Sequence, residues 1–493
     1  LLFFAIMASR LGVKYLLTGN SIFKKFSIKK NVLVYGAGEV GRQLVIALEN
    51  SPEFRVAGFL DDNDQLHRQI VVGKTVYSVL KLEKLIQTLN IGFVFLAMPS
   101  ISRGRRNQII ENINKYKLNV KTLPSISEIV DGTITISDVK DFRIDDLLNR
   151  KEVKPNYDLL NRNIYLKTVL ITGAGGSIGS ELCRQIIKLK PSKIILIELN
   201  EYTLYKINEE LKSKNLTINI VPLLINSQDQ EKLEMIFDTF DVDTVYHAAA
   251  YKHVPIVEHN LIEGLKNNVF GTLKIAEIAL NNDVSDFVFI STDKAVRPTN
   301  VMGLSKRVSE SVIDTYQQRY LKKEIETKFS IVRFGNVLES SGSLIPILRS
   351  QIIKGGPITI THPDVTRYFM TISEAAHLVL ESSFISQGKE IFLFDMGKPM
   401  KIIDLAKRMV NLYGRQLKSS KTPDGIEIKF IGLRPGEKLY EELLVDNKSI
   451  KTLNKNIYIS DEKRINENNF KKYKEFLNNN IYNIKSTDLK LIF

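Results

Sequence analysis

The sequence contains a single cysteine, Cys183, among 493 residues. One thiol excludes a disulfide framework and a cysteine-based zinc site, and it fits a reducing compartment. The six histidines show no spacing typical of metal ligands. We interpret the pair His253 and His259 as loop or surface residues, and we predict no metal site.

Long apolar runs are also missing. At the N-terminus only Leu1–Ala8 is continuously apolar before Arg10 and Lys14, whereas a helix that crosses a bilayer needs roughly 20 apolar residues. Lysines follow up to Lys30, as expected on the cytoplasmic side of a membrane helix. We predict that residues 1–30 are the stub of a truncated membrane segment or a membrane-proximal amphipathic helix. The alternative is a short packing helix of a soluble domain.

Positive charge is in excess, with 69 Lys and Arg against 55 Asp and Glu and a formal net charge of +14. This balance favours an anionic partner, such as a lipid surface, a phosphorylated substrate or nucleic acid. The alternative is a lysine-rich composition whose charges are merely solvated. Because the sequence has no zinc-finger, helix-turn-helix or RNA-binding signature, we do not predict nucleic acid as a partner.

Residues 31–140 have the alternating pattern of a Rossmann-like domain. Strands are predicted at residues 31–35, 55–60 and 91–97. Gly36, Gly38 and Gly41 follow the first strand, and Asp61 follows the second about 20 residues later, which is the spacing of a dinucleotide fingerprint. The ligand of this domain stays open, because a vacant regulatory or structural domain fits equally well. Residues 141–166 break the alternation and are predicted to be a linker.

A second unit of this kind begins at Lys167. Its first strand, Thr168–Thr172, leads into glycine-rich Gly173–Gly179 and a helix, whose N-terminus suits a pyrophosphate. The next strand ends at Glu198, a carboxylate that would bond a ribose and repel a 2′-phosphate, so NAD is favoured over NADP. Small residues in His247–Ala250 let a cofactor lie against the backbone. Asn226, at the end of the third strand, could meet the adenine.

The stretch Ile290–Lys306 predicts a catalytic rim. Thr292, Asp293 and Lys294 end an apolar strand, and polar residues at the carboxyl end of a parallel strand commonly form active sites. Met302 and Lys306 lie four apart on one helical face. Many nucleotide-dependent reductases have tyrosine where Met302 stands, and methionine cannot move a proton. The alternative for the triplet is a strand-end turn with a capping aspartate.

Beyond residue 335 the alternation weakens into a smaller region. Its polar motifs are Gly342–Pro346, Thr366–Tyr368 and Arg434–Lys438. Arginines in such loops suit a diphosphate, which they bind through forked hydrogen bonds, although surface salt bridges are the alternative. Residues 461–493 are predicted to be a peripheral helix and tail without chemistry.

These motifs together resemble a known family. Residues 167–445 are similar to the nucleotide-sugar branch of the extended short-chain dehydrogenase/reductase superfamily, and most similar to long-form, membrane-associated bacterial UDP-N-acetylglucosamine 4,6-dehydratases of the bacillosamine and protein-glycosylation type. The resemblance rests on Thr172–Glu181, His247–Pro255, Ser291–Lys294, Met302-x-x-x-Lys306, Arg333–Asn336 and Arg434–Lys438.

The resemblance implies an α/β fold of two Rossmann-like doubly wound parallel-sheet domains. The catalytic domain would cover residues 167–460 and carry a smaller C-terminal substrate-binding region. The long form has N-terminal transmembrane helices, so we expect attachment to the inner membrane with the catalytic domain facing the cytoplasm. We also expect a homo-oligomer.

The resemblance also implies site residues. NAD would lie on Gly173, Gly176, Ser177, Ile178 and Gly179, with Glu198 at one ribose and Lys306 at the nicotinamide ribose; the small residues Ala248 and Ala249 are already predicted from the sequence pattern to face the cofactor. The UDP-sugar would meet Asn336, Arg367, Arg434 and Glu437, and Lys252 would approach the substrate.

A 4,6-dehydratase oxidises carbon 4 of the sugar, eliminates water across carbons 5 and 6, and returns hydride to carbon 6. We expect Asp293 to be the acid, kept protonated by burial, and Lys294 to be the carbon-5 base, its pKa lowered by desolvation and neighbouring positive charge. Thr292 would bond the carbon-4 oxygen, Lys306 would orient the ribose, and Met302 would pack passively. The base for the carbon-4 hydroxyl stays open, with Asp293 preferred.

Three rival functions stay open. A UDP-sugar 4-epimerase or a carbon-5-inverting dehydratase fits the same scaffold, as does a non-catalytic nucleotide-sensing protein.

Overall fold

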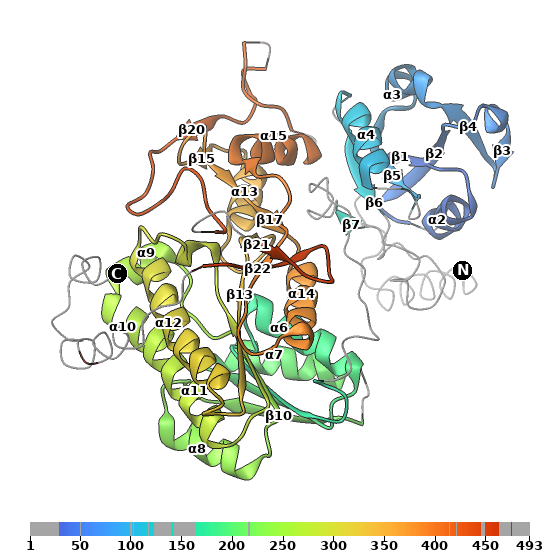
Figure 1. The fold of residues 1–493 in the computed structure, drawn as a ribbon. Helices are drawn as coiled ribbons and strands as arrows, with labels where there is room; N and C mark the ends of the chain where they lie inside the picture. The colour runs from blue at the N-terminus through green and yellow to red at the C-terminus, as the bar shows by residue number, and fades with distance from the viewer. Residues whose placement is uncertain are drawn as a thin grey trace, which may run out of the picture. The chain divides into compact units, whose positions relative to one another are not determined.

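The computed structural model describes residues 29–49, 51–98, 101, 103–116, 118–122, 140–141, 163–214, 217–413, 415–420, 422–444, 449–462 and 475. The chain forms two compact units, the second of which begins beyond Asn149, and each is described by itself (Figure 1). The predicted linker and C-terminal tail lie almost entirely outside the described residues, so the domain limits stay predictions.

The first unit is a mainly parallel sheet with helices on both faces. Its strands are β1 (Lys30–Tyr35), β2 (Phe54–Asp61), β3 (Ile70–Val71), β4 (Lys74–Ser78), β5 (Ile91–Leu96), β6 (Asn119–Thr122) and β7 (Lys140–Asp141). Its helices are α2 (Glu39–Glu49), α3 (Leu82–Leu89) and α4 (Arg103–Asn114). The strand order is β3-β4-β2-β1-β5-β6-β7, with β3 and β7 antiparallel to their neighbours. The three strands predicted from the sequence are confirmed.

Strand β1 explains why both faces of this sheet are covered. Val32 and Val34 pack into the core on the α2 side, whereas Leu33 and Tyr35 pack into the core under α3 and α4. A strand that is apolar on both faces is typical of a parallel sheet between helical layers.

The first glycine loop has the predicted strand–turn–helix setting. Gly36 has a positive φ of 102°, and a Cβ on Gly41 would lie 1.9 Å from the Gly36 carbonyl oxygen. Asp61, at the end of β2, accepts a hydrogen bond from the Ala37 amide at 2.8 Å. The fold of a dinucleotide fingerprint is therefore present, and its ligand stays an open question.

The second unit contains a larger sheet. Its strands are β8 (Thr168–Thr172), β9 (Lys193–Glu198), β10 (Asn219–Leu224), β11 (Thr244–His247), β12 (Asp286–Ile290), β13 (Lys328–Arg333), β18 (Ile391–Phe394), β21 (Ser449–Lys451) and β22 (Ile457–Ser460). The order is β10-β9-β8-β11-β12-β13-β18-β22-β21. Strands β10 to β18 of this order are parallel, and β22 and β21 close one edge in antiparallel pairing.

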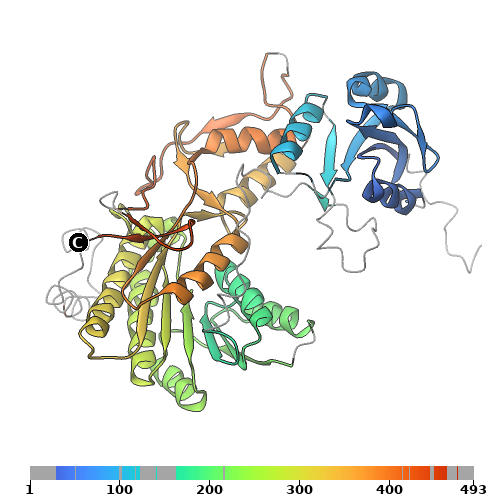
Figure 2. The ribbon, with the colours of Figure 1, turned by 45° about the vertical axis from the view of Figure 1, so that its right-hand side comes forward.

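Helices cover both faces of this sheet, as Figure 2 shows. The helices of the unit are α6 (Ser177–Ile186), α7 (Glu201–Lys212), α8 (Gln230–Thr239), α9 (Val254–His259), α10 (Leu261–Leu265), α11 (Gly271–Asn281), α12 (Val301–Leu321), α13 (Leu344–Ile353), α14 (Ile372–Ile385) and α15 (Ile402–Leu412), the last of which belongs to this unit up to Met409. Helices α6, α7 and α14 contribute to one apolar core, and α8, α11 and α12 contribute to the other. The predicted fold class, with two Rossmann-like doubly wound sheets, is confirmed.

Strand register brings the predicted motifs to one edge of the sheet. Thr172 pairs with His247, so the glycine loop starts beside the alanine-rich strand end. Ile290 pairs with Val332, and beyond the strands the Asp293 amide donates to the Phe334 carbonyl at 3.1 Å. Because all these strands are parallel, their carboxyl ends meet at the same edge.

The described residues of the smaller C-terminal region form three two-stranded pairings. They are β14 (Asn336–Val337) with β17 (Phe369–Met370), β15 (Ile358–Ile360) with β20 (Ile428–Phe430), and β16 (Thr366–Arg367) with β19 (Met400–Lys401). The first pairing continues from the end of β13 and fixes Asn336 next to the catalytic rim.

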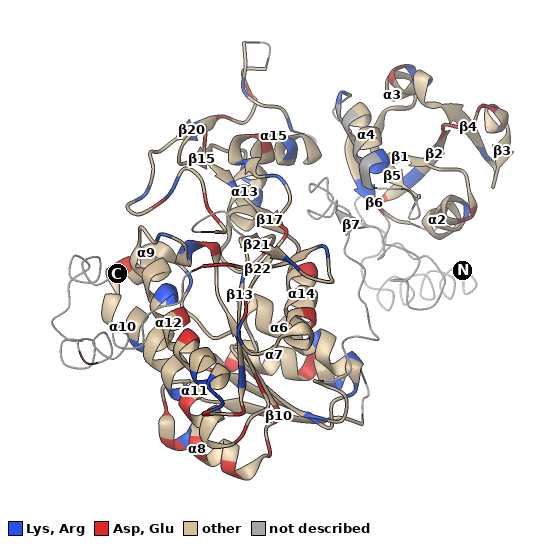
Figure 3. Ribbon diagram, viewed as in Figure 1, with Lys and Arg blue, Asp and Glu red and all other residues tan. Residues whose placement is uncertain are grey.

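Of the predicted membrane segment, residues 1–30, the first 28 residues lie outside the described part of the chain. Among the residues that the structure describes, no helix combines the length and apolarity needed to cross a membrane. Basic and acidic residues are interspersed over both units (Figure 3).

Candidate active site

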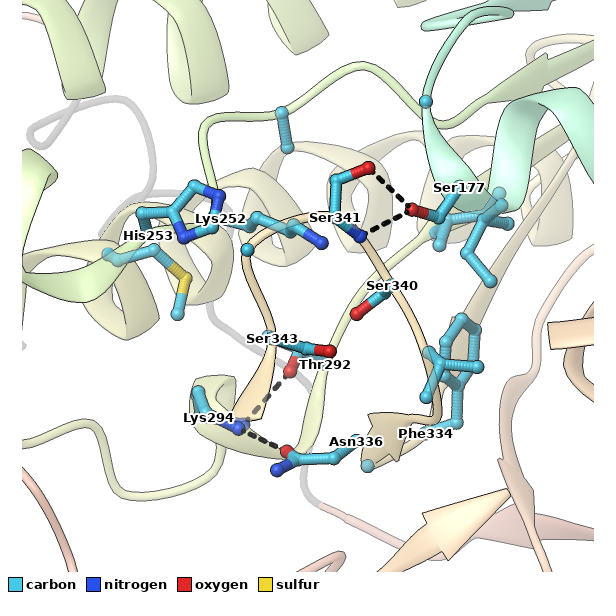
Figure 4. Close-up of a pocket in the computed structure, with 18 of the residues that line it drawn as sticks. Ser177, Lys252, His253, Thr292, Lys294, Phe334, Asn336, Ser340, Ser341 and Ser343 are labelled. Atoms are coloured by element: carbon cyan, nitrogen blue, oxygen red, sulfur yellow. Dashed lines mark hydrogen bonds between the residues drawn. The ribbon is translucent and has the colours of Figure 1, made fainter. Parts of the chain in front are cut away.

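A cavity of about 520 Å³ lies at the carboxyl edge of the second sheet. It brings together most of the residues predicted from the sequence (Figure 4). The predicted residues that line it are Gly176, Ser177, Ile178, Gly179, Ala248, Lys252, Thr292, Lys294, Met302, Lys306 and Asn336. The predicted residues outside the lining are Gly173, Glu198, Asn226, Ala249, Asp293, Arg367, Arg434 and Glu437.

The second glycine loop forms one wall of the cavity. Gly173 has a positive φ of 64°, and a Cβ there would lie 2.8 Å from the Ala249 backbone. A Cβ on Gly179 would lie 2.0 Å from the Gly173 carbonyl oxygen, so glycine is required where α6 packs on the loop. The bare backbone and the N-terminus of α6 face the cavity, which is the geometry that binds a pyrophosphate.

Glu198 is fixed beside this loop. One carboxylate oxygen accepts from the Gly175 amide at 2.9 Å, and the other accepts from the Leu199 and Asn200 amides. Its place at the end of β9 fits the predicted ribose contact. Asn226 instead accepts from the Gln228 amide at 2.9 Å within the turn before α8, and its adenine contact stays a prediction.

Asn268 supports the cavity wall, and the sequence reasoning assigned it no role. Its amide oxygen accepts from the Tyr251 amide at 2.8 Å, and its amide nitrogen donates to the Tyr251 carbonyl at 3.0 Å and to Ser305 at 2.9 Å. It lies in the π-helical turn Lys266–Phe270, and such turns often occur at functional sites. The adjacent asparagines inside an apolar helix were the signal in the sequence.

A hydrogen bond joins the glycine loop to the segment Ser340–Ser343, which also lines the cavity. The Ser177 hydroxyl accepts from the Ser341 amide at 3.1 Å, and Figure 4 shows the segment Ser340–Ser343 crossing the site. A Cβ on Gly342 would lie 2.4 Å from the His253 ring, so this segment packs tightly.

Asp293 is completely buried behind the cavity wall. Its Oδ1 accepts from the Thr292 hydroxyl at 2.9 Å and from Lys294 Nζ at 3.0 Å. Its Oδ2 has no hydrogen-bond partner among the described residues and points toward Gly335, where a Cβ would lie 3.1 Å away. The triplet therefore forms one connected group, which a strand-end cap alone would not require.

Lys294 corrects one prediction. Its Nζ lies 3.0 Å from Asp293 Oδ1, 3.0 Å from Asn336 Oδ1 and 3.7 Å from Glu441 Oε1. Burial lowers the pKa of Lys294, but the Asp293 and Glu441 carboxylates outweigh it, so the pKa is raised. The predicted lowering was wrong because it overlooked these two carboxylates. In this arrangement Lys294 is an ammonium group.

Lys306 and Met302 lie on one face of α12, as predicted. Lys306 Nζ donates to the Ile290 carbonyl at 2.6 Å and lies 3.9 Å from the centre of the Phe289 ring. Burial lowers the pKa of Lys306 to about 7. Met302 is buried and packs with Val257 and neighbouring apolar residues, which fits a packing role.

Lys252 presents a second amine to the cavity. Burial lowers its pKa, and none of the described residues forms a hydrogen bond or ion pair with it. Its ammonium is therefore available to an anionic ligand.

The predicted nucleotide-binding residues form a network below the cavity. Arg367 is buried; one of its NH groups donates to Glu437 at 3.2 Å, and its Nε lies 3.8 Å from Glu441. Glu437 also accepts from the Thr361 hydroxyl and the Arg434 amide. The Arg434 side chain is exposed. The Arg367–Glu437 pair is thus a protein ion pair, and its contact with UDP stays a prediction.

Comparison with known proteins places the second unit in a family. The family model described as "Polysaccharide biosynthesis protein" matches residues 169–462. The capsular polysaccharide biosynthesis protein CapD of Staphylococcus aureus is 42% identical over 424 residues, covering 85% of this chain and 69% of CapD. A protein named UDP-glucose 4-epimerase from Rickettsia typhi is 34% identical over 281 residues, covering 56% of this chain and 77% of the relative.

A solved structure agrees with this relationship. The X-ray structure of Pen from Bacillus thuringiensis is 32% identical, with a TM-score of 0.54, and the match covers 61% of this chain and 92% of Pen. The chain belongs to the polysaccharide biosynthesis protein family.

Proposed function

We propose that this chain is an NAD-dependent 4,6-dehydratase that converts UDP-N-acetylglucosamine to its UDP-4-keto-6-deoxy sugar, for a glycan of the bacillosamine type. The observation that carries the proposal is the hydrogen-bonded group Thr292, Asp293 and Lys294, of which Thr292 and Lys294 line the same cavity as a dinucleotide-type glycine loop. An acid–base pair next to a redox cofactor site is what oxidation followed by elimination needs. Membership of a polysaccharide biosynthesis family supports a nucleotide-sugar substrate.

The residues around the glycine loop fit NAD. Gly176 lines the cavity and has no side chain, so its backbone is open to a ligand. A Cβ at this position would have one heavy atom nearby, the Gly173 carbonyl oxygen at 3.1 Å. Glu198 would bond the adenosine ribose and Lys306 the nicotinamide ribose. When bound, NAD supplies reversible oxidation of the sugar, so no external oxidant is consumed.

The protein's own groups would divide the proton transfers. In this proposal Asp293 accepts the proton of the carbon-4 hydroxyl through the Thr292 hydroxyl, because Lys294 faces two carboxylates and holds its own proton. The Lys294 ammonium would stabilise negative charge on the carbon-4 oxygen, donate a proton to the departing carbon-6 hydroxyl and take the carbon-5 proton in return. Lys294 would give a proton back to carbon 5 as hydride enters carbon 6, and Asp293 would then reprotonate Lys294 across their 3.0 Å hydrogen bond. The Thr292 hydroxyl, 2.9 Å from Asp293, would orient the carbon-4 oxygen.

The UDP end would bind among the remaining cations. Lys252 faces the cavity without a protein partner among the described residues, so it suits the diphosphate. Asn336, Arg367, Arg434 and Glu437 would complete the nucleotide site.

The same proposal includes attachment to the inner membrane through residues 1–30, with the catalytic domain facing the cytoplasm. The apolar run Leu1–Ala8 and the lysines that follow it support membrane attachment. The proposal also includes a homo-oligomer.

Product analysis tests the proposal. Purified protein is incubated with UDP-N-acetylglucosamine and the product is identified by NMR. A 4-keto-6-deoxy sugar is expected. Asp293→Asn should reduce kcat by roughly 10²–10⁴-fold while UDP binding, measured by calorimetry, is retained. Full activity of Asp293→Asn would mean that Asp293 is not the proton acceptor, whereas absence of turnover by the wild-type protein would favour the non-catalytic alternative.

A 4-epimerase is the second candidate, and the 34% identity to the Rickettsia typhi protein of that name favours it. It predicts UDP-N-acetylgalactosamine as the sole product. A carbon-5-inverting dehydratase would give a keto sugar whose carbon-5 configuration differs, which the same NMR spectra resolve.

A further inference from the structure

Glu441 is a buried carboxylate for which the proposed reaction has no assigned role. Its Oε1 lies 3.7 Å from Lys294 Nζ and 3.8 Å from Arg367 Nε. Its Oε2 has no hydrogen-bond partner among the described residues. The residue is only 8% exposed, and a carboxylate is rarely buried so deeply without a specific charge partner.

The chain around Glu441 is anchored at several points. The Gly436 carbonyl accepts from the Thr299 hydroxyl at 2.8 Å and from Asn300 at 3.1 Å. Lys438 Nζ donates to the Val296 carbonyl at 2.8 Å. These contacts tie the segment to the turn that follows Lys294, so the position of Glu441 beneath that lysine is fixed by tertiary structure.

Leu439 anchors the segment on its other side. Its carbonyl accepts from the Thr366 amide at 3.0 Å and from Arg367 at 3.2 Å. The backbone that carries Glu441 is therefore joined both to the catalytic rim and to β16 of the predicted nucleotide site.

Three charged groups have the largest effects on the pKa of Lys294. The Asp293 and Glu441 carboxylates face it and favour the ammonium, whereas Arg367 opposes it. Glu441 is in turn faced by Lys294, Arg367 and Lys438, which are cationic, and by Asp293. Burial raises the pKa of Glu441 despite these cations, so this carboxylate depends on Lys294 for charge compensation.

We propose that Glu441 is a positioning residue for the group formed by Thr292, Asp293 and Lys294. This proposal rests on the proposed function. It holds the Lys294 ammonium in place against Asp293 and Asn336, and it sets the pH range over which Lys294 keeps its proton. By also contacting Arg367, it links the lysine that works on the sugar to the side that binds the nucleotide.

Glu441→Gln tests this role, with Glu442→Gln as the matched control. Glu442 is the next residue, and its carboxylate forms an ion pair with Arg297 at 3.1 Å. Both side chains are exposed, that of Glu442 by 43% and that of Arg297 by 57%. Lys294 is 21% exposed in its side chain, so acetic anhydride can reach it. Its extent of acetylation is measured by mass spectrometry across a pH series.

In Glu441→Gln the midpoint of Lys294 acetylation should move to lower pH, because one of the two carboxylates that favour the ammonium is lost. The alkaline limb of kcat should move in the same direction, and kcat should fall by up to about 10²-fold as the lysine loses its fixed position. Glu442→Gln should leave both unchanged. Glu441→Asp, which keeps the charge, should restore the midpoint toward the wild-type value. An unchanged midpoint in Glu441→Gln would overturn the proposal.

The two proposals fail in different ways. If wild-type protein gives no keto sugar but the acetylation midpoint shifts, the proposed function is wrong and the role of Glu441 in charging Lys294 holds. If keto sugar forms and neither the midpoint nor the pH profile responds to Glu441→Gln, the role of Glu441 is wrong. Should Glu441→Gln fail to fold, the decision rests on Glu441→Asp. The acetylation midpoint of Glu441→Asp must then stay near the wild-type value, and that of Glu442→Gln must also be unshifted; a large shift in Glu441→Asp would contradict the proposal.

Discussion

Replacing Gly335 with alanine should disturb Asp293 without removing any polar group. A Cβ at position 335 would lie 3.1 Å from Asp293 Oδ2, 3.2 Å from Met396 Cε and 3.2 Å from Tyr368 Cβ. Met396 has a flexible side chain and can turn away. Asp293 is completely buried and held by Thr292 and Lys294, so it can move only with them.

The size of the effect follows from these distances. The neighbours must give way by a few tenths of an ångström, and overpacking of this kind costs about 1–3 kcal/mol of stability. A misplacement of about 1 Å can cost about 10²-fold in rate, so a shift of a fraction of that size should lower kcat by roughly tenfold. KM for the UDP-sugar should change less than kcat, because the new Cβ meets Asp293 Oδ2 directly, whereas it reaches the predicted UDP contacts Asn336 and Arg367 only through Tyr368 and the backbone.

The assay is steady-state formation of the 4-keto product, with thermal unfolding measured in parallel. Gly92→Ala is the control, since a Cβ there meets nothing within 4 Å. If Gly335→Ala retains the full kcat while Asp293→Asn does not, the position of Asp293 is not critical in the way that the structure indicates. If KM rises alone, Gly335 serves the nucleotide site instead.

Three further predictions concern the same cavity. Gly179→Ala should abolish dinucleotide binding in calorimetry, because the new Cβ would lie 2.0 Å from the Gly173 carbonyl oxygen; retained affinity would contradict this account of the loop. Met302→Leu should reduce kcat only modestly compared with Asp293→Asn, since Met302 packs among apolar side chains; complete loss of turnover in a folded Met302→Leu protein would contradict a packing role. Burial lowers the pKa of Lys306 to about 7, against about 10.4 in an unfolded chain. Between these two values the unfolded state binds more protons than the folded state, so the stability of the fold should rise with pH from about 7 to about 10. Lys306→Met should flatten that rise in Tm, and an equally steep rise in the variant would refute the assignment.

The features that local sequence determines were predicted well. The apolar runs that became β1, β8 and β12 are buried strands, and the glycines that follow two of them are required by close backbone contacts such as that between Gly179 and Gly173. Thr292 and Lys294 could be placed at the rim because parallel strands end at the same edge. These inferences depend on steric and periodic rules that act over a few residues.

What the sequence did not reveal depends on contacts between distant segments. Lys294 was expected to lose its proton easily, yet its pKa is raised by the adjacent Asp293 carboxylate and also by Glu441, which is far along the chain and lies 3.7 Å away. Glu441 itself is placed by hydrogen bonds from Thr299 and Asn300 to the Gly436 carbonyl, and no local pattern encodes such a contact. The ion pair of Arg367 with Glu437 was not predicted either, and the contact of Arg367 with UDP stays a prediction.

The most direct test of the central claim is the mass of the nucleotide sugar after incubation of the wild-type protein with UDP-N-acetylglucosamine in heavy water. Dehydration with reprotonation at carbon 5 predicts a product that has lost one water and gained one solvent-derived deuterium. Asp293→Asn should give this product far more slowly. A deuterium-free product of unchanged mass that separates from the substrate by chromatography and is identified as UDP-N-acetylgalactosamine would mean that the enzyme epimerises the sugar, and it would contradict the dehydratase assignment.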